Sequence, residues 1–213
     1  MVSDVLYLIE TMRKVLALIT GIPLFLWATQ LPDLAESLPS PGDSRPIAEV
    51  EMQSFSNIWK TDPPLLSPII EQSFEVNLQG YGVVYFLSFV DKSLSENSPS
   101  LSHWIVDGGR VRRELPSSEA IAPEGSVFVS LDAVVFGELN FDGFTDVYTI
   151  ATYATQNEST EATSFPVVVL YEQNPEDLSF QILEVESLEL TARRLSTVAE
   201  VEEILRREML FLP

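Results

Sequence analysis

The chain has 213 residues, 46% of them hydrophobic, which is enough for one domain with a packed core plus an appendage. Its 32 acidic residues against 12 Lys and Arg give a formal net charge of −20, which opposes binding to the phosphate backbone of a nucleic acid. The sequence contains no cysteine, so disulfides, thiolate metal sites and thiol nucleophiles are excluded. With a single histidine, His103, a zinc site built from several histidines is excluded as well.

An uncharged apolar segment lies near the N-terminus. No charged residue occurs in residues 15–32, and Arg13 and Lys14 stand just before that segment. A basic pair followed by an apolar stretch is typical of a secretory signal, and a start at Met12 would give such a signal conventional proportions. We therefore predict that residues 1–32 are a signal peptide or a membrane anchor.

The choice between a cleaved signal and an anchor stays open. The sequence around residues 28–35 offers no well-defined cleavage site, and a run of 18 uncharged residues is near the lower limit for crossing a bilayer. Residues 33–46 are rich in Pro, Ser and Gly and indicate a flexible linker, which disfavours a buried core helix before them. In both cases the rest of the chain is expected to be periplasmic or secreted, because the basic pair favours the cytoplasmic side.

Residues 47–213 are predicted to form a β-rich domain. A short helix is expected around Phe55 and Ile58, before Pro63. Alternating and fully apolar runs predict two hairpins, 74–78 with 83–90 and 103–106 with 110–115, the second closed by Asp107-Gly108-Gly109. Further strands are expected at 126–129, 133–137, 147–153, 165–171 and 180–183.

The hydrophobic period changes at the C-terminus and predicts a helix with one apolar face. The apolar positions are Val198, Val201, Leu205, Met209 and Leu212. Thr197 stands three residues before Glu200, which is the spacing of a capping box. This face is expected to pack on the sheet, with a partner groove or a membrane surface as the alternatives.

The acidic residues Glu184, Glu186 and Glu189 are interpreted as the solvent face of a strand. The predicted fold class is α+β, mainly β. It combines an antiparallel sheet of hairpins, a C-terminal amphipathic helix and an N-terminal apolar signal or anchor helix.

An acidic loop joins the strands predicted at 133–137 and 147–153. Residues 138–146 carry oxygen-bearing side chains at the first, third, fifth and ninth places and glycine at the sixth. This spacing lets a short loop wrap a hard cation, and oxygen ligands of this kind suit Ca²⁺. The predicted ligands are the side chains of Glu138, Asn140, Asp142 and Asp146 and the main-chain carbonyl of Phe144.

The loop resembles the calcium loop of FG-GAP and VCBS-type repeats, which lies between two β-strands in extracytoplasmic proteins. Similar single copies occur in small secreted bacterial proteins, including some that resemble periplasmic lysozyme inhibitors. The resemblance covers residues 134–153 and implies a structural calcium site. The chain departs from the pattern at Glu138, where Asp is usual, and Thr149 at the twelfth place cannot supply the bidentate ligand of an EF-hand. A solvated Asp-Gly turn that binds no metal is the alternative.

No catalytic motif accompanies the loop in the sequence. It has no Gly-x-Ser-x-Gly elbow, no phosphate-binding glycine loop and no His-Glu-x-x-His helix, and His103 beside Trp104 is more typical of a buried residue than of a lone base. We therefore expect a non-enzymatic extracytoplasmic binding module, stabilised by Ca²⁺, with a protein or glycan as its unknown ligand. The alternatives are an envelope-anchored structural or assembly protein, held in the membrane by residues 15–32, and a hydrolase that acts through carboxylates in a cleft.

Overall fold

The computed structural model describes residues 40–60, 65–93, 95, 98–155 and 163–211. The chain divides into two units, Met1–Leu38 and Pro39–Pro213, and all described residues belong to the second. The predicted signal or anchor therefore lies outside the described residues. The linker prediction is wrong for Ser44–Pro46, because these residues form a strand, β1, that pairs with residues 74–76.

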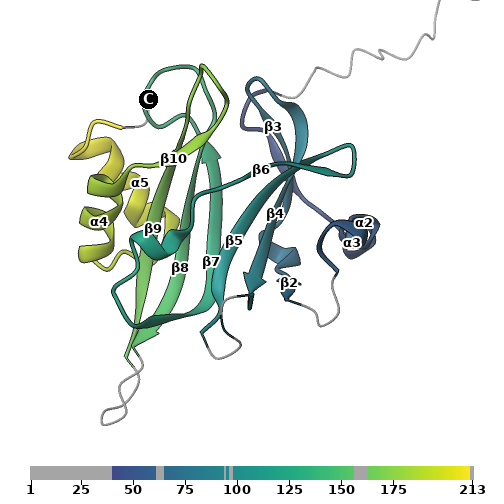
Figure 1. Ribbon diagram of the computed structural model, residues 1–213. Coiled ribbons are helices and arrows are strands. Elements are labelled where there is room, and N and C mark those ends of the chain that lie inside the picture. Colours follow the sequence, from purple (N-terminus) through teal and green to yellow (C-terminus); the bar gives the residue numbers. More distant parts are fainter. Residues whose placement is uncertain (1–39, 61–64, 94, 96–97, 156–162, 212–213) are drawn as a thin grey trace, which may run out of the picture. The chain divides into compact units, whose positions relative to one another are not determined.

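Six strands of the described chain form one antiparallel sheet, here called sheet A, in the order β1-β3-β4-β5-β6 with β2 also paired to β4 (Figure 1). Both predicted hairpins are present, and the turn between β5 and β6 uses positive φ angles of 55° at Gly108 and 73° at Gly109. Glycine reaches these angles without the steric cost that a Cβ atom imposes. The bounds are β2 Leu66–Pro68, β3 Phe74–Leu78, β4 Gly82–Asp91, β5 Ser100–Asp107 and β6 Arg110–Glu114.

Strands β2 and β3 share one edge of β4 and are separated by a 3-10 turn, η2 (Ile70–Gln72). Ser88 of β4 stands opposite this interruption. Its amide donates to Ser73 Oγ at 3.0 Å, and its carbonyl accepts from the Ile69 amide at 2.8 Å. Its hydroxyl donates to the Gln72 carbonyl at 2.6 Å. Serine side chains thus replace the backbone pairing that the turn removes, as buried polar groups require.

The second sheet, sheet B, has the order β10-β9-β8-β7 and is also antiparallel. Residues 126–137 form one strand, although two short strands were predicted there. Val129 and Asp132 each stand outside the regular pairing with β8, so the strand carries two bulges that break the alternation of its sequence. The bounds are β7 Ser126–Gly137, β8 Asp146–Thr155, β9 Ser164–Gln173 and β10 Phe180–Ile182.

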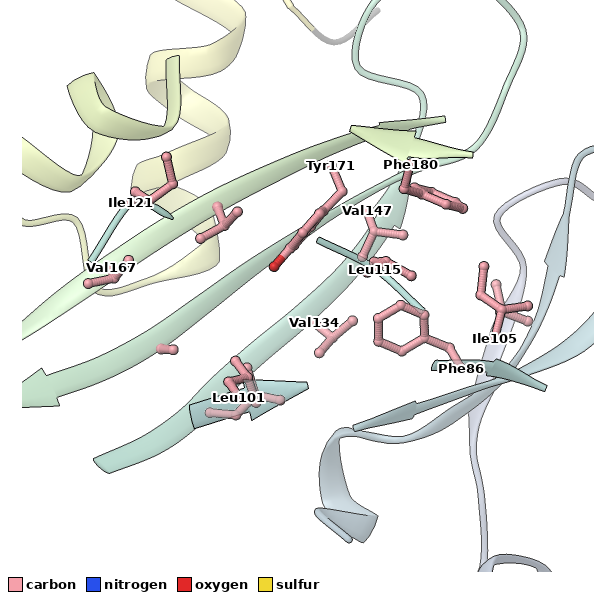
Figure 2. Packing of buried hydrophobic residues seen from close by; sticks show 14 of the residues in the cluster. Phe86, Leu101, Ile105, Leu115, Ile121, Val134, Val147, Val167, Tyr171 and Phe180 are labelled. Carbon is pink, nitrogen blue, oxygen red and sulfur yellow. The ribbon is translucent and has the colours of Figure 1, made fainter. Parts of the chain in front are cut away.

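The two sheets face each other across an apolar cluster to which both contribute, as Figure 2 shows for Phe86 and Ile105 of sheet A and Val134, Val147 and Tyr171 of sheet B. A second cluster joins the outer face of sheet A to the helices α2 (Glu49–Ser54) and α3 (Ser56–Trp59). A third joins the outer face of sheet B to α4 (Glu184–Ala192) and α5 (Val198–Arg207). The prediction of a mainly β, α+β domain with antiparallel strands is confirmed.

The C-terminal helix is confirmed as α5, which ends at Arg207. Val201 and Leu205 are fully buried against sheet B, so its apolar face packs on the sheet. The capping box is present: Thr197 Oγ1 accepts from the Glu200 amide at 3.3 Å, and the Glu200 carboxylate accepts from the Thr197 amide at 3.1 Å.

Helix α4 was not predicted, and the interpretation of Glu184, Glu186 and Glu189 as the solvent face of a strand is wrong. Two buried residues of α4 attach it to sheet B. Leu190 packs into the cluster below the helix, and Ser187 Oγ accepts from the Leu170 amide at 3.0 Å. Among the residues that the structure describes, no helix has the length and apolar character needed to span a bilayer.

Candidate functional site

The predicted metal loop connects β7 to β8, two neighbouring antiparallel strands in which Gly137 pairs with Asp146. The β-strand context that the sequence predicted is therefore present. Its tight course requires positive φ angles of 64° at Phe141 and 83° at Gly143. This conformation suits glycine but costs roughly 1 kcal/mol or more at a residue with a Cβ atom. Phe141 nevertheless occupies it and is 59% exposed.

Side chains of the loop bind the loop's own backbone. Glu138 Oε1 accepts from the Gly143 amide at 2.7 Å, and Asp142 Oδ1 accepts from the Phe144 amide at 2.8 Å. Asn140 Oδ1 accepts from the Asp142 amide at 3.2 Å. These local bonds, of the kind that Asn and Asp commonly make in turns, give the loop its shape. Within the described ranges, no three His, Cys, Asp or Glu side chains are gathered tightly enough to hold a metal ion.

Asp146, the ninth position of the loop, is completely buried. Its Oδ2 accepts from the Leu139 amide and its Oδ1 from the Gln173 amide, each at 2.8 Å. Burial raises the pKa of Asp146 to about 6, the two amide bonds act in the opposite direction, and the charges of Asp142 and Glu172 raise it further. The buried carboxylate therefore lies near two negative side chains, Asp142 and Glu172.

Glu172 of β9 is a member of this group that the sequence analysis missed. Asn140 Nδ2 donates to Glu172 Oε1 at 2.6 Å and to Asp142 Oδ2 at 3.0 Å, so one amide group lies between two carboxylates. Glu172 Oε2 accepts from Gln181 Nε2 of β10 at 2.6 Å. No spacing motif could identify Glu172, because only the pairing of β8 with β9 brings it beside Asp146.

The donor set of this group fits a hard divalent cation. Asn140, Asp142, Asp146 and Glu172 offer oxygen ligands, which Ca²⁺ prefers, and the Phe144 carbonyl belongs to the same loop. A cation between Asp142 and Glu172 would take the place of the Asn140 NH₂ group, and rotation of that amide would present Oδ1 instead. Glu138 is bound to the Gly143 amide and would have to leave it to reach a metal.

His103 lies in the interior between the two sheets and is 2% exposed. Its Nδ1 is 3.0 Å from Ser88 Oγ, and its ring lies 5.1 Å from the ring of Phe86 and 6.1 Å from that of Tyr171. Burial lowers the pKa of His103 to about 3, so the imidazole is neutral at physiological pH. The ring is therefore shielded from bulk solvent.

Two carboxylates line one pocket away from the loop. Glu119 and Glu124, both exposed, border a pocket of about 190 Å³ beside Tyr153. In the described part of the chain, neither carboxylate is hydrogen-bonded to a nucleophile or a base. The pocket thus has the residue type that a carboxylate-dependent hydrolase uses.

No protein-family model, no curated protein and no solved structure matches the chain.

Proposed function

We propose that this protein is a non-enzymatic, extracytoplasmic binding module whose loop 138–146 binds Ca²⁺ and thereby fixes a recognition surface. One observation carries the proposal: the Asn140 amide lies between the carboxylates of Asp142 and Glu172, beside the buried Asp146. The charges of Asp142 and Glu172 oppose ionisation of Asp146, and a divalent cation would relieve that repulsion. Residues 15–32, with their resemblance to a secretory signal or anchor, are the basis for the extracytoplasmic location.

The cation would have a structural role. Asp142, Asp146, Glu172 and Asn140 would hold it, together with the Phe144 carbonyl. The loop contains no histidine or lysine that could use a metal-bound water in catalysis. A weak site suffices outside the cytoplasm, where calcium is present at millimolar concentrations.

Phe141 is the residue that we propose contacts the partner. It is a large aromatic side chain, exposed at a position where the backbone is strained, in the middle of the loop. Aromatic side chains contribute strongly to protein and glycan binding because they bury a large area with few rotatable bonds. A cation that holds the loop rigid would reduce the entropy lost when Phe141 binds.

Thermal unfolding with and without calcium tests the metal site. At a calcium concentration ten times the dissociation constant, binding should add about 1.4 kcal/mol of stability and raise the melting temperature of the wild type by several degrees. Asp142→Asn should lose most of this rise. Glu124→Gln removes one negative charge from an exposed position outside the site and should keep it. A wild-type melting temperature that is the same in millimolar calcium and in chelator would refute the metal site.

Affinity purification from the extracytoplasmic fraction tests the role of Phe141. The baits are the wild type, Phe141→Ser and Leu210→Ser. Leu210 is a matched control because it is 77% exposed and also has a positive φ, 58°, but lies beyond α5. A protein or glycan retained by the wild type and by Leu210→Ser, and lost with Phe141→Ser, would support the proposal. Equal retention by all three baits would contradict a contact through Phe141.

A further inference from the structure

Several buried polar atoms of the described residues lack a hydrogen-bond partner, and three of them belong to Tyr171 and to two side chains near it in the interior between the two sheets. These three are His103 Nε2, Thr149 Oγ1 and Tyr171 Oη. His103 belongs to β5 of sheet A, whereas Thr149 and Tyr171 belong to β8 and β9 of sheet B. All three side chains are buried, so bulk solvent does not satisfy these atoms. Such groups are rare in native proteins, and each requires an explanation.

Tyr171 is a neighbour of both other side chains. The rings of His103 and Tyr171 lie 6.1 Å apart with their planes at 78°. Val147 pairs with Tyr171 and Thr149 pairs with Val169, so Thr149 and Tyr171 are diagonal neighbours on the same face of sheet B. Figure 2 shows the Tyr171 ring among the apolar side chains of this interior.

The Thr149 and Tyr171 hydroxyl groups are also close in space. Burial and the neighbouring Tyr153 raise the pKa of the Tyr171 phenol, and the Thr149 hydroxyl opposes them. The Thr149 hydroxyl acts on that pKa as a hydrogen-bond partner, but the two hydroxyl groups do not meet the full distance and angle criteria of a direct hydrogen bond. A third group between them would give each hydroxyl a well-formed hydrogen bond.

The hydrogen bonds of Ser88 determine the tautomer of His103. A serine hydroxyl has one proton, and Ser88 donates it to the Gln72 carbonyl at 2.6 Å, a group that can only accept. The contact of 3.0 Å between Ser88 Oγ and His103 Nδ1 must therefore be donated by Nδ1–H. In the neutral imidazole Nε2 then carries a lone pair and needs a donor.

We propose that His103 Nε2, Tyr171 Oη and Thr149 Oγ1 form a site that binds one water molecule between the sheets. The water donates one hydrogen bond to Nε2, and each hydroxyl group can accept its second proton or donate to its oxygen. Buried waters typically make about three such bonds to groups that lack other partners. A neutral ligand fits, because the three groups are uncharged and apolar side chains surround them. The water would connect the two sheets through polar bonds across an otherwise apolar interface.

A high-resolution crystal structure tests the site directly. The expected result is a water oxygen within about 3.2 Å of His103 Nε2 and of at least one of the two hydroxyl oxygens. An interior without such a water, or a direct hydrogen bond from Tyr171 Oη or Thr149 Oγ1 to Nε2, would overturn the proposal. Long-range ¹H–¹⁵N correlation spectra of His103 should show the proton on Nδ1, and a proton on Nε2 would overturn it equally.

Water–protein nuclear Overhauser effects test the site in solution. The wild type should show a long-lived water close to the His103 ring. Tyr171→Phe removes one ligand and should weaken or abolish that signal, whereas Tyr148→Phe makes the same chemical change on the opposite face of sheet B and should preserve it. Thr149→Val, which keeps the side-chain shape, provides a second variant if Tyr171→Phe does not fold. A wild type without the signal, or a signal unchanged in Tyr171→Phe or Thr149→Val, would refute the water site.

Discussion

His103 in sheet A and Asp146 in sheet B are both buried titratable groups, but their surroundings act on them in different ways. His103 lies between aromatic rings and keeps one hydrogen bond, to Ser88, so burial favours its neutral form. Asp146 accepts two backbone hydrogen bonds that favour its charged form, while burial and two nearby carboxylates oppose that form. The surroundings of His103 thus favour an uncharged ring, whereas those of Asp146 act on its charge in opposite directions.

This contrast predicts opposite pH dependences for the two sites. The pKa of His103 lies below its usual value and that of Asp146 above it. A lowered histidine pKa makes the fold less stable in acid, and a raised carboxyl pKa makes it less stable at higher pH. Each of the following variants changes His103, Asp146 or a side chain beside one of them.

The largest expected effect is acid destabilisation through His103. Its pKa rises from about 3 in the native state to 6.5 in the unfolded chain, so the unfolded chain takes up a proton that the native protein does not. The stabilisation is fully present above pH 6.5 and is lost progressively as the pH falls towards 3, by about 5 kcal/mol in total. Urea denaturation between pH 7 and pH 4 measures this loss.

His103→Asn isolates that contribution. Asparagine does not titrate in this range and can place an amide nitrogen near the position of Nδ1. Carboxylates elsewhere contribute equally to both proteins, so the difference between their pH profiles reports on His103 alone. Parallel pH profiles for the wild type and the variant would show that His103 is accessible to protons in the native state.

The second largest effect is expected from Asp146 and has the opposite sign. Its pKa is about 6 in the native state and 3.8 in the unfolded chain, so the native protein holds the proton more tightly. In chelator, this contribution is fully present below pH 3.8 and is lost as the pH rises through 6, amounting to about 3 kcal/mol. Urea denaturation in chelator between pH 4 and pH 7 should show this component in the wild type and not in Asp146→Asn.

Repeating the same measurement with calcium tests the metal site. If the loop binds Ca²⁺, the cation stabilises the ionised carboxylate, and the loss of stability between pH 4 and pH 7 should become smaller for the wild type only. An Asp146→Asn profile that matches the wild type in chelator would mean that Asp146 does not have a raised pKa.

Ser88→Ala removes the hydrogen-bond partner of His103 Nδ1. The variant leaves His103 Nδ1 and the Gln72 carbonyl without their hydroxyl partner, and each unsatisfied buried group costs about 1 kcal/mol or more. We expect a loss of about 2 kcal/mol in urea denaturation at pH 7. Ser187→Ala is the matched control: it removes a fully buried hydroxyl that accepts one hydrogen bond, from the Leu170 amide, and should cost less. A larger loss for Ser187→Ala would contradict the importance of the Ser88 bonds.

The sequence predicts the parts of the fold that depend on local patterns. Asp107-Gly108-Gly109 identified the turn between β5 and β6, and the step from Thr197 to Glu200 identified the start of α5. Helix α4 was missed because it has apolar residues on two faces. Leu190 is buried, whereas Val185 and Leu188 are exposed, so no single stripe indicates the helical period.

The candidate site was predictable only where its residues are close in sequence. The loop spacing located Asn140, Asp142 and Asp146 between two strands, and the structure places them there. Glu172 could not be identified because its position depends on the register of β8 against β9. The hydrogen bond between His103 and Ser88 could not be predicted either, because only the pairing of β4 with β5 brings the two residues together.

The smallest expected effect comes from a change at Glu172, beside Asp146. Glu172→Gln removes one of the two negative charges that raise the pKa of Asp146 and keeps an oxygen that can accept from Asn140 Nδ2. In chelator, the pKa of Asp146 should fall by about half a pH unit, which is the size of one partly screened charge a few ångströms away. Carboxyl ¹³C chemical shifts followed during a pH titration measure this change, with Glu124→Gln as the control of equal charge. A pKa that is unchanged in Glu172→Gln would show that desolvation alone raises it, and Glu172 would then lose its place among the groups that favour a cation.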